Sequence, residues 1–328
     1  VPAGLEHPHH GHAAGASQHG GVLMIVGDDH VASSSSIPHA SEQSLIAWGI
    51  PVVNPSSVEE YERFGIWAWA LSRYSGSWVA FKAITETVES GRSFEIAPLD
   101  DLAPALADKQ GGKHPYDPSK FLTPSMEGTL DARLDSVREF AHKYSLDRIL
   151  EAAPDARIGI VSTGKATLDT LDALQQLSSL KDLPAIRHLK IGLSWPVNPQ
   201  SLNDFIEGLD HVLVIEEKGP IIEDQLKNLL FNRAQRPTVS GKRDIENEVL
   251  IPADGQLSPA RVAVVDGTRR LRAAAHTRLR AQLRHGLRPR PCLPPRLPGP
   301  GLGATAFRAL GCGRRPPRRA AARAAPAE

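Results

Sequence analysis

Residues 158–231 decide the fold class, because short apolar runs alternate there with amphipathic stretches. The apolar runs are Ile158-Gly-Ile-Val161, Leu189-Lys-Ile-Gly-Leu193 and Val212-Leu-Val-Ile215. After each run, large apolar residues recur at helical spacing. Parallel strands joined by right-handed helical crossovers place helices on both faces of their sheet. The pattern therefore predicts an α/β unit of three parallel strands and three helices over residues 157–231.

The carboxyl ends of parallel strands are where an α/β sheet binds its ligands. The residues at these ends are Ser162-Thr163-Gly164, Ser194-Trp195-Pro196 and Glu216-Glu217-Lys218. Ser162-Thr163-Gly164-Lys165 stands where a phosphate loop would, but its spacing matches neither GxGxxG nor GxxxxGK[ST]. We interpret it as a helix cap, and the fold alone identifies no ligand.

The first 97 residues predict a second region of short strands and helices. Val22-Leu-Met-Ile-Val26 has the length and branching of a fully buried strand, which ends at Gly27-Asp28-Asp29-His30. A polar serine loop and an amphipathic stretch from Ser41 to Ile46 lead to a second strand, Ile50-Pro51-Val52-Val53. Ser57 is expected to cap the helix that follows.

Residues 98–125 are rich in Pro, Gly, Lys and Asp, which is typical of an exposed connector and indicates a domain boundary. Apolar residues at helical spacing from Leu130 to Tyr144 then predict an amphipathic helix over roughly 126–150. We expect this helix to pack on the unit that follows it.

Charge divides the chain near Gly267-Thr268. Residues 1–268 carry 23 Lys+Arg against 36 Asp+Glu, whereas residues 269–328 carry 15 Arg, no Lys and one Glu. Residues 1–268 contain no cysteine, which excludes a disulfide framework, a cysteine nucleophile and a Cys-ligated metal site within them. No apolar run approaches the roughly 20 residues of a membrane span, and the N-terminus lacks the pattern of a signal peptide. We expect a cytoplasmic protein and, because residue 1 is Val, a piece of a longer one.

Two patterns raise the question of a metal site. Five histidines crowd the first 19 residues, but without a fixed scaffold. Gly27-Asp28-Asp29 followed by Asn54 is similar to the Gly-Asp-Gly and later Asn with which thiamine diphosphate enzymes hold magnesium, although the third Gly is Asp here. Asp28 and Asn54 would supply oxygen ligands of the kind that Mg²⁺ prefers. The alternative is an acidic strand end followed by a turn asparagine, and we expect no metal site in either place.

Several motifs resemble one enzyme family and follow its order along the chain. Together they resemble the indolepyruvate ferredoxin oxidoreductases, in particular the fused long form, over about residues 1–262. Those similar to the family's pyrimidine-binding domain are Gly20-Gly21-Val22, Gly27-Asp28-Asp29-His30, Ser34-Ser35, Pro38-His39, Ser41-Glu42-Gln43, Ile50-Pro51-Val52, Asn54-Pro55 and Ala70-Leu-Ser-Arg-Tyr-Ser-Gly76 with Lys82. Those similar to its transketolase-C-like domain are Gly164-Lys165-Ala166, Gly192-Leu-Ser-Trp-Pro196, Glu216-Glu-Lys218, Ile222-Glu-Asp-Gln-Leu-Lys227 and Gly241-Lys-Arg243.

The resemblance implies an α/β fold in which a partial pyrimidine-binding domain (1–97) and a linker (98–125) precede a helix and a transketolase-C-like parallel-sheet domain (126–262). Such enzymes oxidatively decarboxylate aryl 2-oxo acids with thiamine diphosphate and Mg²⁺. They pass the electrons through [4Fe-4S] clusters to ferredoxin and transfer the acyl group to coenzyme A. The implied parent enzyme is dimeric and has neither membrane nor nucleic acid as a partner.

The resemblance also implies which residues line the cofactor–substrate cleft. His39 and His30 are the expected catalytic residues, because an imidazole titrates near neutral pH and can shuttle a proton. Hydroxyl and imidazole groups can also bind a substrate carboxylate. The alternative is that these polar residues fill a solvated loop. The expected cofactor-binding residues are Asp28, Asp29, Ser34, Ser35 and Glu42.

Other parts of the family's site are not visible in this sequence. The glutamate that activates the aminopyrimidine ring is expected before Val1, and the diphosphate-binding domain and cluster cysteines are expected after residue 268. We therefore expect this chain alone to be inactive. Residues 263–328 are rich in Arg, Pro and Ala, and we expect a disordered tail that arises from a shifted reading frame near residues 265–270. A competing hypothesis is a non-catalytic acidic α/β protein whose Arg-rich tail binds nucleic acid.

Overall fold

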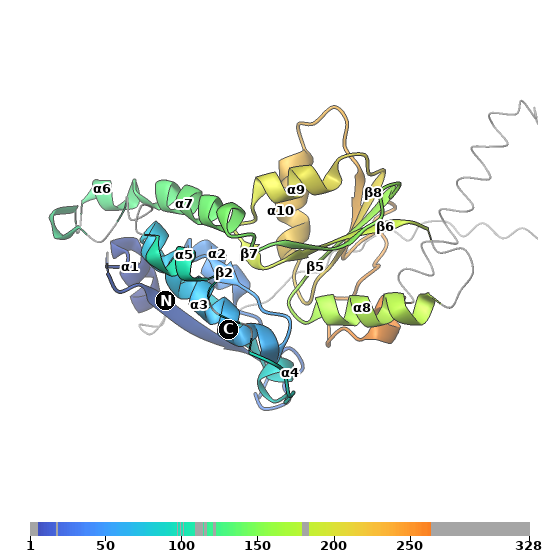
Figure 1. Cartoon of the computed structure of the whole chain (residues 1–328), viewed down its shortest axis with the longest axis horizontal. Coiled ribbons are helices and arrows are strands. Elements are labelled where there is room, and N and C mark those ends of the chain that lie inside the picture. Colours follow the sequence, from blue (N-terminus) through green and yellow to red (C-terminus); the bar gives the residue numbers. More distant parts are fainter. Residues whose placement is uncertain are drawn as a thin grey trace, which may run out of the picture. The chain divides into compact units, whose positions relative to one another are not determined.

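The computed structural model describes residues 6–263, apart from 18, 97, 99, 101, 109–113, 115–116, 121–122 and 179–183. These residues form two β-sheets and the helices around them (Figure 1). The α/β class with parallel strands, predicted from the sequence, is confirmed. The predicted tail lies, from residue 264 onward, outside the described residues. Within the described part of the chain, no helix is long and apolar enough to cross a membrane.

The first sheet has four strands in the order β1-β3-β2-β7. β1, β3 and β2 run parallel, and β7 pairs antiparallel with β2. The sequence predicts full burial of the first strand, but Ile25 of β1 is 73% exposed. That prediction is wrong because β1 lies at the edge of this sheet and pairs only with β3 in the described part of the chain. The strands are β1 (Val22–Asp28), β2 (Val52–Val53), β3 (Trp78–Ile84) and β7 (Leu193–Trp195).

The helix predicted after Ser57 is present, but Ser57 does not cap it. Ser57 stands at the N-cap position of α3 without a side-chain hydrogen bond to the helix. Ser56 instead donates from its backbone N and its Oγ to Glu60, at 2.7 and 2.8 Å. The helices of this part of the chain are α1 (Glu6–Ala14), α2 (Glu42–Ala47), α3 (Val58–Ser75), α4 (Thr85–Val88), α5 (Ala103–Ala107), the 3-10 turn η3 (Pro118–Lys120), α6 (Pro124–Glu127) and α7 (Leu130–Lys143).

The amphipathic helix expected over 126–150 is present as α7, but it packs on α3 instead of on the second sheet. Val137, Phe140 and Ala141 belong to the core that α3 and β3 form. The Phe140 ring lies 5.3 Å from the Tyr74 ring of α3. α7 also contacts α9 of the following unit, so the packing prediction is wrong only for its main contact, which is with α3. The buried residues of α3 occupy a wide arc of its surface and need cover beyond that given by the sheet.

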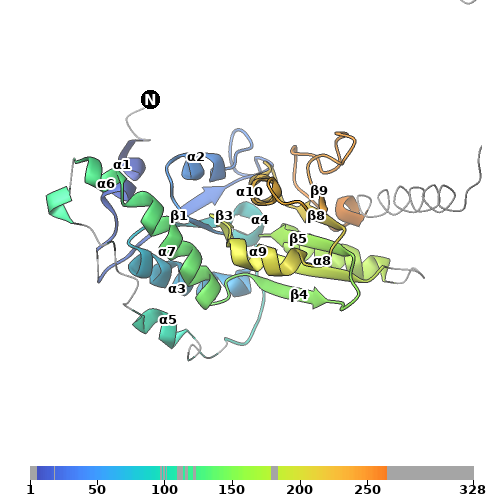
Figure 2. The same cartoon turned by 90° about the horizontal axis from the view of Figure 1, so that it is seen from above.

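The second sheet has five strands in the order β4-β6-β5-β8-β9. β5, β6, β8 and β9 run parallel, and β4 pairs antiparallel with β6. β4 and β9 lie at the two edges of this sheet (Figure 2). The strand–helix alternation predicted over 157–231 is confirmed in order and type. The strands and helices of this second sheet and its cover are β4 (Arg148–Ala152), β5 (Ile158–Thr163), α8 (Ala166–Leu177), β6 (Ile186–Ile191), α9 (Pro199–Ile206), β8 (His211–Ile215), α10 (Ile221–Leu230) and β9 (Thr238–Ser240).

Helices cover both faces of the second sheet, as the crossover rule predicts. α9 and α10 pack on one face, together with Val161 and Val212. α8 packs on the other face, together with Ile160 and Leu213. Neighbouring residues of β5 and of β8 therefore point to opposite faces, which makes each strand buried on both sides.

The chain passes from the second sheet to the first at a single residue, Gly192, between β6 and β7. A Cβ atom at this position would lie 2.3 Å from the Leu146 carbonyl oxygen and 3.0 Å from the Phe64 ring, so only glycine fits. The sequence predicts one continuous strand over 189–193, whereas the structure has two strands in different sheets. This crossing holds the strand ends of both sheets together at the candidate site.

Candidate functional site

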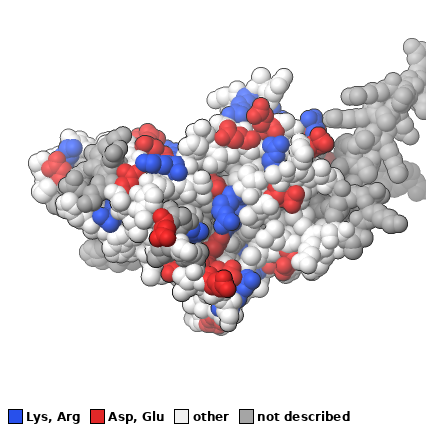
Figure 3. Space-filling model, viewed as in Figure 1, with Lys and Arg blue, Asp and Glu red and all other residues white. Residues whose placement is uncertain are grey.

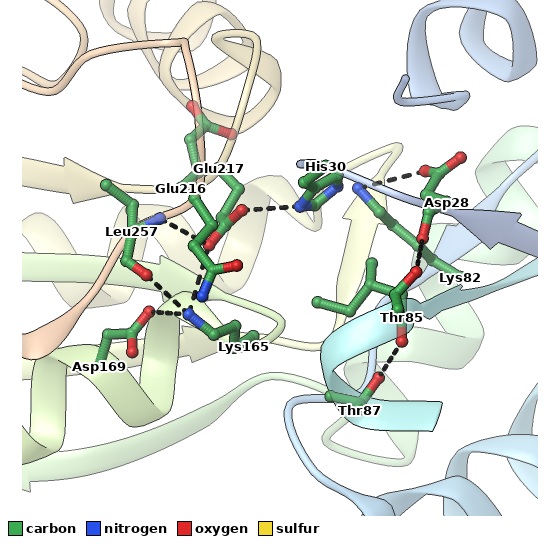
Figure 4. Close-up of polar contacts among 12 residues, drawn as sticks. Asp28, His30, Lys82, Thr85, Thr87, Lys165, Asp169, Glu216, Glu217 and Leu257 are labelled. Carbon is green, nitrogen blue, oxygen red and sulfur yellow. Dashed lines mark hydrogen bonds and ion pairs between the residues drawn. The ribbon is translucent and has the colours of Figure 1, made fainter. Parts of the chain in front are cut away.

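Polar side chains from both sheets line a small cavity of about 10 Å³, room for about one water molecule, at the carboxyl ends of their strands. Figure 4 shows the polar contacts around it. This is the edge at which the sequence predicts ligands to bind, and each of the three predicted strand-end segments contributes to the lining. The lining residues are His30, Glu42, Asn54, Lys82, Ile84, Thr163, Gly164, Lys165, Ser194, Glu216, Glu217 and Ile221.

His30 follows β1 and is almost completely buried, with 1% of its surface exposed. Its Nδ1 lies 2.7 Å from the Oε2 atom of Glu217, which follows β8 of the second sheet (Figure 4). Its Nε2 is buried and has no hydrogen-bond partner among the described residues. An unpaired buried polar atom is costly, which makes His30 Nε2 a candidate contact for a polar group at this site.

Glu217 is held from three directions. Besides His30, its Oε1 accepts a hydrogen bond from the backbone N–H of Leu257 at 3.0 Å and lies 3.6 Å from the Lys165 Nζ. Burial favours the neutral acid, but the contacts with His30, Lys165 and Leu257 outweigh it and lower the pKa of Glu217. The carboxylate therefore stays ionised beside the imidazole.

Lys82 of β3 lies in a buried ion-pair network with two carboxylates of the first sheet. Its Nζ lies 2.5 Å from Glu42 Oε1 and 3.5 Å from Asp28 Oδ2. Burial alone would lower the pKa of Lys82, but Glu42 and Asp28 outweigh burial and raise it. Asp28 also accepts hydrogen bonds from the Oγ and the backbone N of Ser41, at 2.6 and 3.1 Å. Glu42 and Lys82 line the cavity, whereas Asp28 does not line it and contacts Lys82 through their ion pair.

Asp29 organises the serine loop instead of facing the cavity. Its carboxylate accepts the backbone N–H groups of Ser33, Ser34 and Ser35, each at 2.8 Å. Burial opposes ionisation, but these donors outweigh it and hold the pKa of Asp29 well below its usual range. Ser34 is exposed and Ser35 is half-buried, and neither lines the cavity.

His39 lies on the solvent side of the same loop. Its side chain is 42% exposed, and its Nε2 lies 3.1 Å from the Gly27 carbonyl oxygen and 3.8 Å from the Asp28 carboxylate. The structure therefore brings His30 and Glu42 together at the cavity, while His39 stands outside it.

Asp28 and Asn54 have different neighbours in the structure. The Asp28 carboxylate faces Ser41 and Lys82, whereas the Asn54 amide packs against Gly164, where its Oδ1 lies 2.5 Å from the position that a Cβ would take. In the part of the chain that the structure describes, no three His, Cys, Asp or Glu side chains are placed to hold a metal ion. The five N-terminal histidines lie partly outside the residues whose side chains are described.

The segment interpreted as a helix cap works differently from that prediction. Lys165 occupies the N-cap position of α8 without a side-chain cap, and its Nζ donates to Asp169 and to the Leu257 carbonyl, each at 2.8 Å. The carboxylate of Glu216, which follows β8, does bind the start of a helix, α10. Glu216 accepts the backbone N–H groups of Ile221, Ile222 and Glu223 at the first turn of α10.

Sequence reasoning missed the roles of Glu217, Lys82 and Lys165. All three residues stand in the motifs that resemble the family, but the sequence analysis gave none of them a role. β3 was not predicted, so nothing placed Lys82 at a strand end.

Comparison with known proteins connects this arrangement to one group of enzymes. Residues 148–287 match the family model described as "Indolepyruvate oxidoreductase domain". The chain is 24% identical over 235 residues to the indolepyruvate oxidoreductase subunit IorA of Thermococcus kodakarensis, covering 70% of this chain and 35% of that protein. It is 26% identical over 229 residues to IorA of Pyrococcus horikoshii, covering 68% of this chain and 34% of that protein. The chain thus spans about a third of the length of these curated relatives.

A solved structure shares the fold. The 2-oxoglutarate:ferredoxin oxidoreductase of Magnetococcus marinus superposes with a TM-score of 0.52 at 12% identity, covering 79% of this chain and 50% of that one. This likeness shows a shared α/β fold. By family model, sequence and fold, the chain is indolepyruvate oxidoreductase-like and resembles a part of the IorA subunit.

Proposed function

We propose that this chain supplies part of the substrate cleft of a thiamine diphosphate-dependent 2-oxoacid:ferredoxin oxidoreductase that acts on an aryl 2-oxo acid such as indolepyruvate. The observation that carries the proposal is the buried His30, which lines the cavity between the two sheets and whose Nε2 has no hydrogen-bond partner among the described residues. The similarity to IorA subunits supports the substrate class.

The chain's own residues take distinct parts in this proposal. His30 accepts a proton or a hydrogen bond from the bound substrate, because its Nε2 has no other hydrogen-bond partner among the described residues. Glu42 and Lys82 form the polar wall beside it, and Asp28 fixes Lys82. Asp29 shapes the loop that carries Ser34, Ser35 and His39 to the solvent side. From there, His39 passes protons between the loop and solvent.

The described residues fit only part of the cofactor. The small cavity beside His30 admits one polar group of the cofactor or substrate, and the described His, Cys, Asp and Glu side chains form no group of three that could hold a metal ion. When bound, thiamine diphosphate supplies the electron sink that lets a 2-oxo acid lose CO₂. In this proposal, residues outside the described ones bind the magnesium ion and the diphosphate.

Electron transfer also needs residues beyond this sequence. The whole chain has two cysteines, fewer than the four that a [4Fe-4S] cluster needs. Clusters, ferredoxin, coenzyme A and a dimeric assembly therefore belong to the proposed parent enzyme. Acidic and basic side chains are interspersed on the face shown in Figure 3, and the Arg-rich segment on which the nucleic-acid hypothesis rests lies outside the described residues.

The test is indolepyruvate-dependent reduction of methyl viologen by the full oxidoreductase that contains this chain, with thiamine diphosphate, Mg²⁺ and coenzyme A present. His30→Ala should lower kcat by about 10²–10⁴-fold, the usual contribution of a positioned acid or base. His39→Ala should lower it less, because His39 is exposed. Lys227→Ala, which removes only a half-exposed ion pair within α10, is the control. Full activity of His30→Ala would contradict the proposal.

A further inference from the structure

We infer that Glu217 is a positioning residue for His30: a carboxylate from the second sheet holds the imidazole of the first sheet so that its Nε2 lone pair points into the cavity. The inference rests on the proposed function for the role of His30 and adds the partner that sets its chemistry. The dyad forms only where the two sheets meet, since each sheet supplies one of its members.

The geometry of the pair is that of a fixed hydrogen bond. Nδ1 and Oε2 lie 2.7 Å apart, and the two side chains are 2% and 7% exposed. Glu217 is itself immobilised by the Leu257 N–H and by Lys165. The imidazole therefore cannot rotate without breaking a buried, charge-assisted bond.

The ionised carboxylate determines which nitrogen of His30 carries the hydrogen. A carboxylate can only accept hydrogen bonds, so Nδ1 must donate. In the neutral imidazole the second nitrogen, Nε2, is then unprotonated and acts as an acceptor. This selection requires Glu217 to be ionised, and its contacts with His30, Lys165 and Leu257 favour the ionised form.

The dyad would stabilise a proton taken up at Nε2. When the imidazole accepts a proton from a bound donor, the donor keeps its bonding electron pair and the new N–H bond forms at Nε2. The positive charge that results on the ring lies beside the Glu217 carboxylate. The other charged groups at the cavity have partners: Lys82 pairs with Glu42, Lys165 pairs with Asp169, and Glu216 accepts three backbone N–H groups of α10.

The experiment reads the tautomer of His30 by NMR in the full chain, with ¹⁵N-labelled histidine and long-range proton–nitrogen correlation. His30→Gln assigns the resonances. In the wild-type chain above the pH at which its histidines titrate, we expect Nδ1 in the protonated range and Nε2 in the unprotonated range. In Glu217→Ala, the population with hydrogen on Nε2 should rise at least severalfold.

Two further variants make the test decisive. Asp169→Asn removes another carboxylate next to Lys165 but does not touch His30, so it should leave the tautomer unchanged. If Glu217→Ala gives a disordered amide spectrum, Glu217→Gln replaces it, since its amide can either accept or donate and should also raise the Nε2–H population. A wild-type ring with hydrogen on Nε2, or variants at 217 that keep the wild-type pattern, would overturn the inference.

The outcome is separable from that of the activity assay, because the NMR experiment needs no ligand. A confirmed tautomer with a fully active His30→Ala enzyme would reject the proposed function and keep the dyad. In the active oxidoreductase, Glu217→Ala combined with His30→Ala should be no slower than His30→Ala alone. Independent losses that multiply would show that Glu217 does not act through His30.

Discussion

His188 of β6 is a buried histidine in the core of the second sheet and is no part of the cavity. Its Nε2 lies 2.7 Å from the Ser162 Oγ, its Nδ1 has no partner among the described residues, and its exposed fraction is 0%. Burial lowers the pKa of His188 to about 4 from its ordinary value of 6.5. The folded protein therefore holds this ring in the neutral form at neutral pH.

Acid should destabilise the protein through His188. Its folded-state pKa is the lower one, so stability is fully present above pH 6.5 and falls as the unfolded chain takes up a proton between pH 6.5 and 4. Between pH 7 and pH 5 we expect a loss of about 2 kcal/mol from this group. The free energy of unfolding, measured with urea at pH 7 and at pH 5, checks this expected loss. His188→Gln should show a pH-dependent loss smaller by that amount, and an unchanged loss would contradict the prediction.

Gly164 should not tolerate a side chain. Its φ is +56°, and a Cβ would lie 2.5 Å from the Asn54 Oδ1 across the junction of the two sheets. Gly164→Ala should lower the free energy of unfolding by about 2 kcal/mol, through backbone strain and displacement of Asn54. Urea unfolding measures the change. Gly91→Ala is the matched control, because its Cβ would meet nothing within 4 Å, and an equal effect of both variants would refute the argument.

Only part of the residue-scale site could be predicted from the sequence. The family motifs placed His30 and Glu42 in the site, and both line the cavity. The partner of His30 lies 187 positions further along the chain, so no local pattern could have identified Glu217. Asp28 and Asp29 were expected to bind a cofactor, yet their carboxylates accept hydrogen bonds from their own loop and from Ser41.

At the scale of elements, α1 is held in place by a side chain of α7. The buried Arg133 guanidinium donates to the carbonyl oxygens of His12, Ala13 and Ala14, each at 3.1 Å. Helix C-termini leave such carbonyls without partners inside the helix. One arginine therefore satisfies the end of α1 from a position about 120 residues away.

Arg133→Met should release α1 from the rest of the protein. The three carbonyl groups would lose a charged donor, which costs about 2 kcal/mol and raises local opening about 30-fold. Hydrogen–deuterium exchange over residues 10–17 should speed up accordingly, while exchange in β5 and β8 stays the same. Arg138→Met removes only a hydrogen bond to Asp135 within α7 and should change nothing in α1. Equal exchange in both variants would show that Arg133 does not hold α1.

Periodic elements were predictable, and short or context-dependent ones were not. The three parallel strands and three helices over 157–231 follow from apolar spacing and are confirmed. β7 has three residues and β4 is mostly exposed, so neither has a clear hydrophobic pattern. The packing of α7 on α3 depended on which apolar surface remained uncovered, and the sequence of α7 does not contain that information.

At the scale of the whole described region, a largely buried ion pair connects β6 of the second sheet to α3, which packs on the first. Lys190 of β6 pairs with Glu60 of α3, with exposed fractions of 3% and 18%, and its Nζ lies 5.1 Å above the Phe64 ring. Burial makes such a pair costly to break on one side only.

Lys190→Met should therefore destabilise the protein by about 3 kcal/mol, because it leaves the Glu60 carboxylate without its cation. The double variant Lys190→Met with Glu60→Gln should recover a substantial part of that loss. Urea unfolding of the wild type, both single variants and the double variant gives the coupling free energy. Losses that simply add would show that the pair contributes nothing across the junction.

The strand crossing at Gly192 also has a consequence for synthesis on the ribosome. β2 and β3 emerge early, but β7, the neighbour that completes the other side of β2, follows β3 by roughly 110 residues. At about 5–20 residues per second, the bare edge of β2 waits on the order of 5–20 seconds for its partner. During this interval the nascent chain exposes strand edges that invite wrong pairing. The first sheet is thus finished by the second half of the chain, and slowing translation between residues 85 and 195 should increase the demand for chaperones.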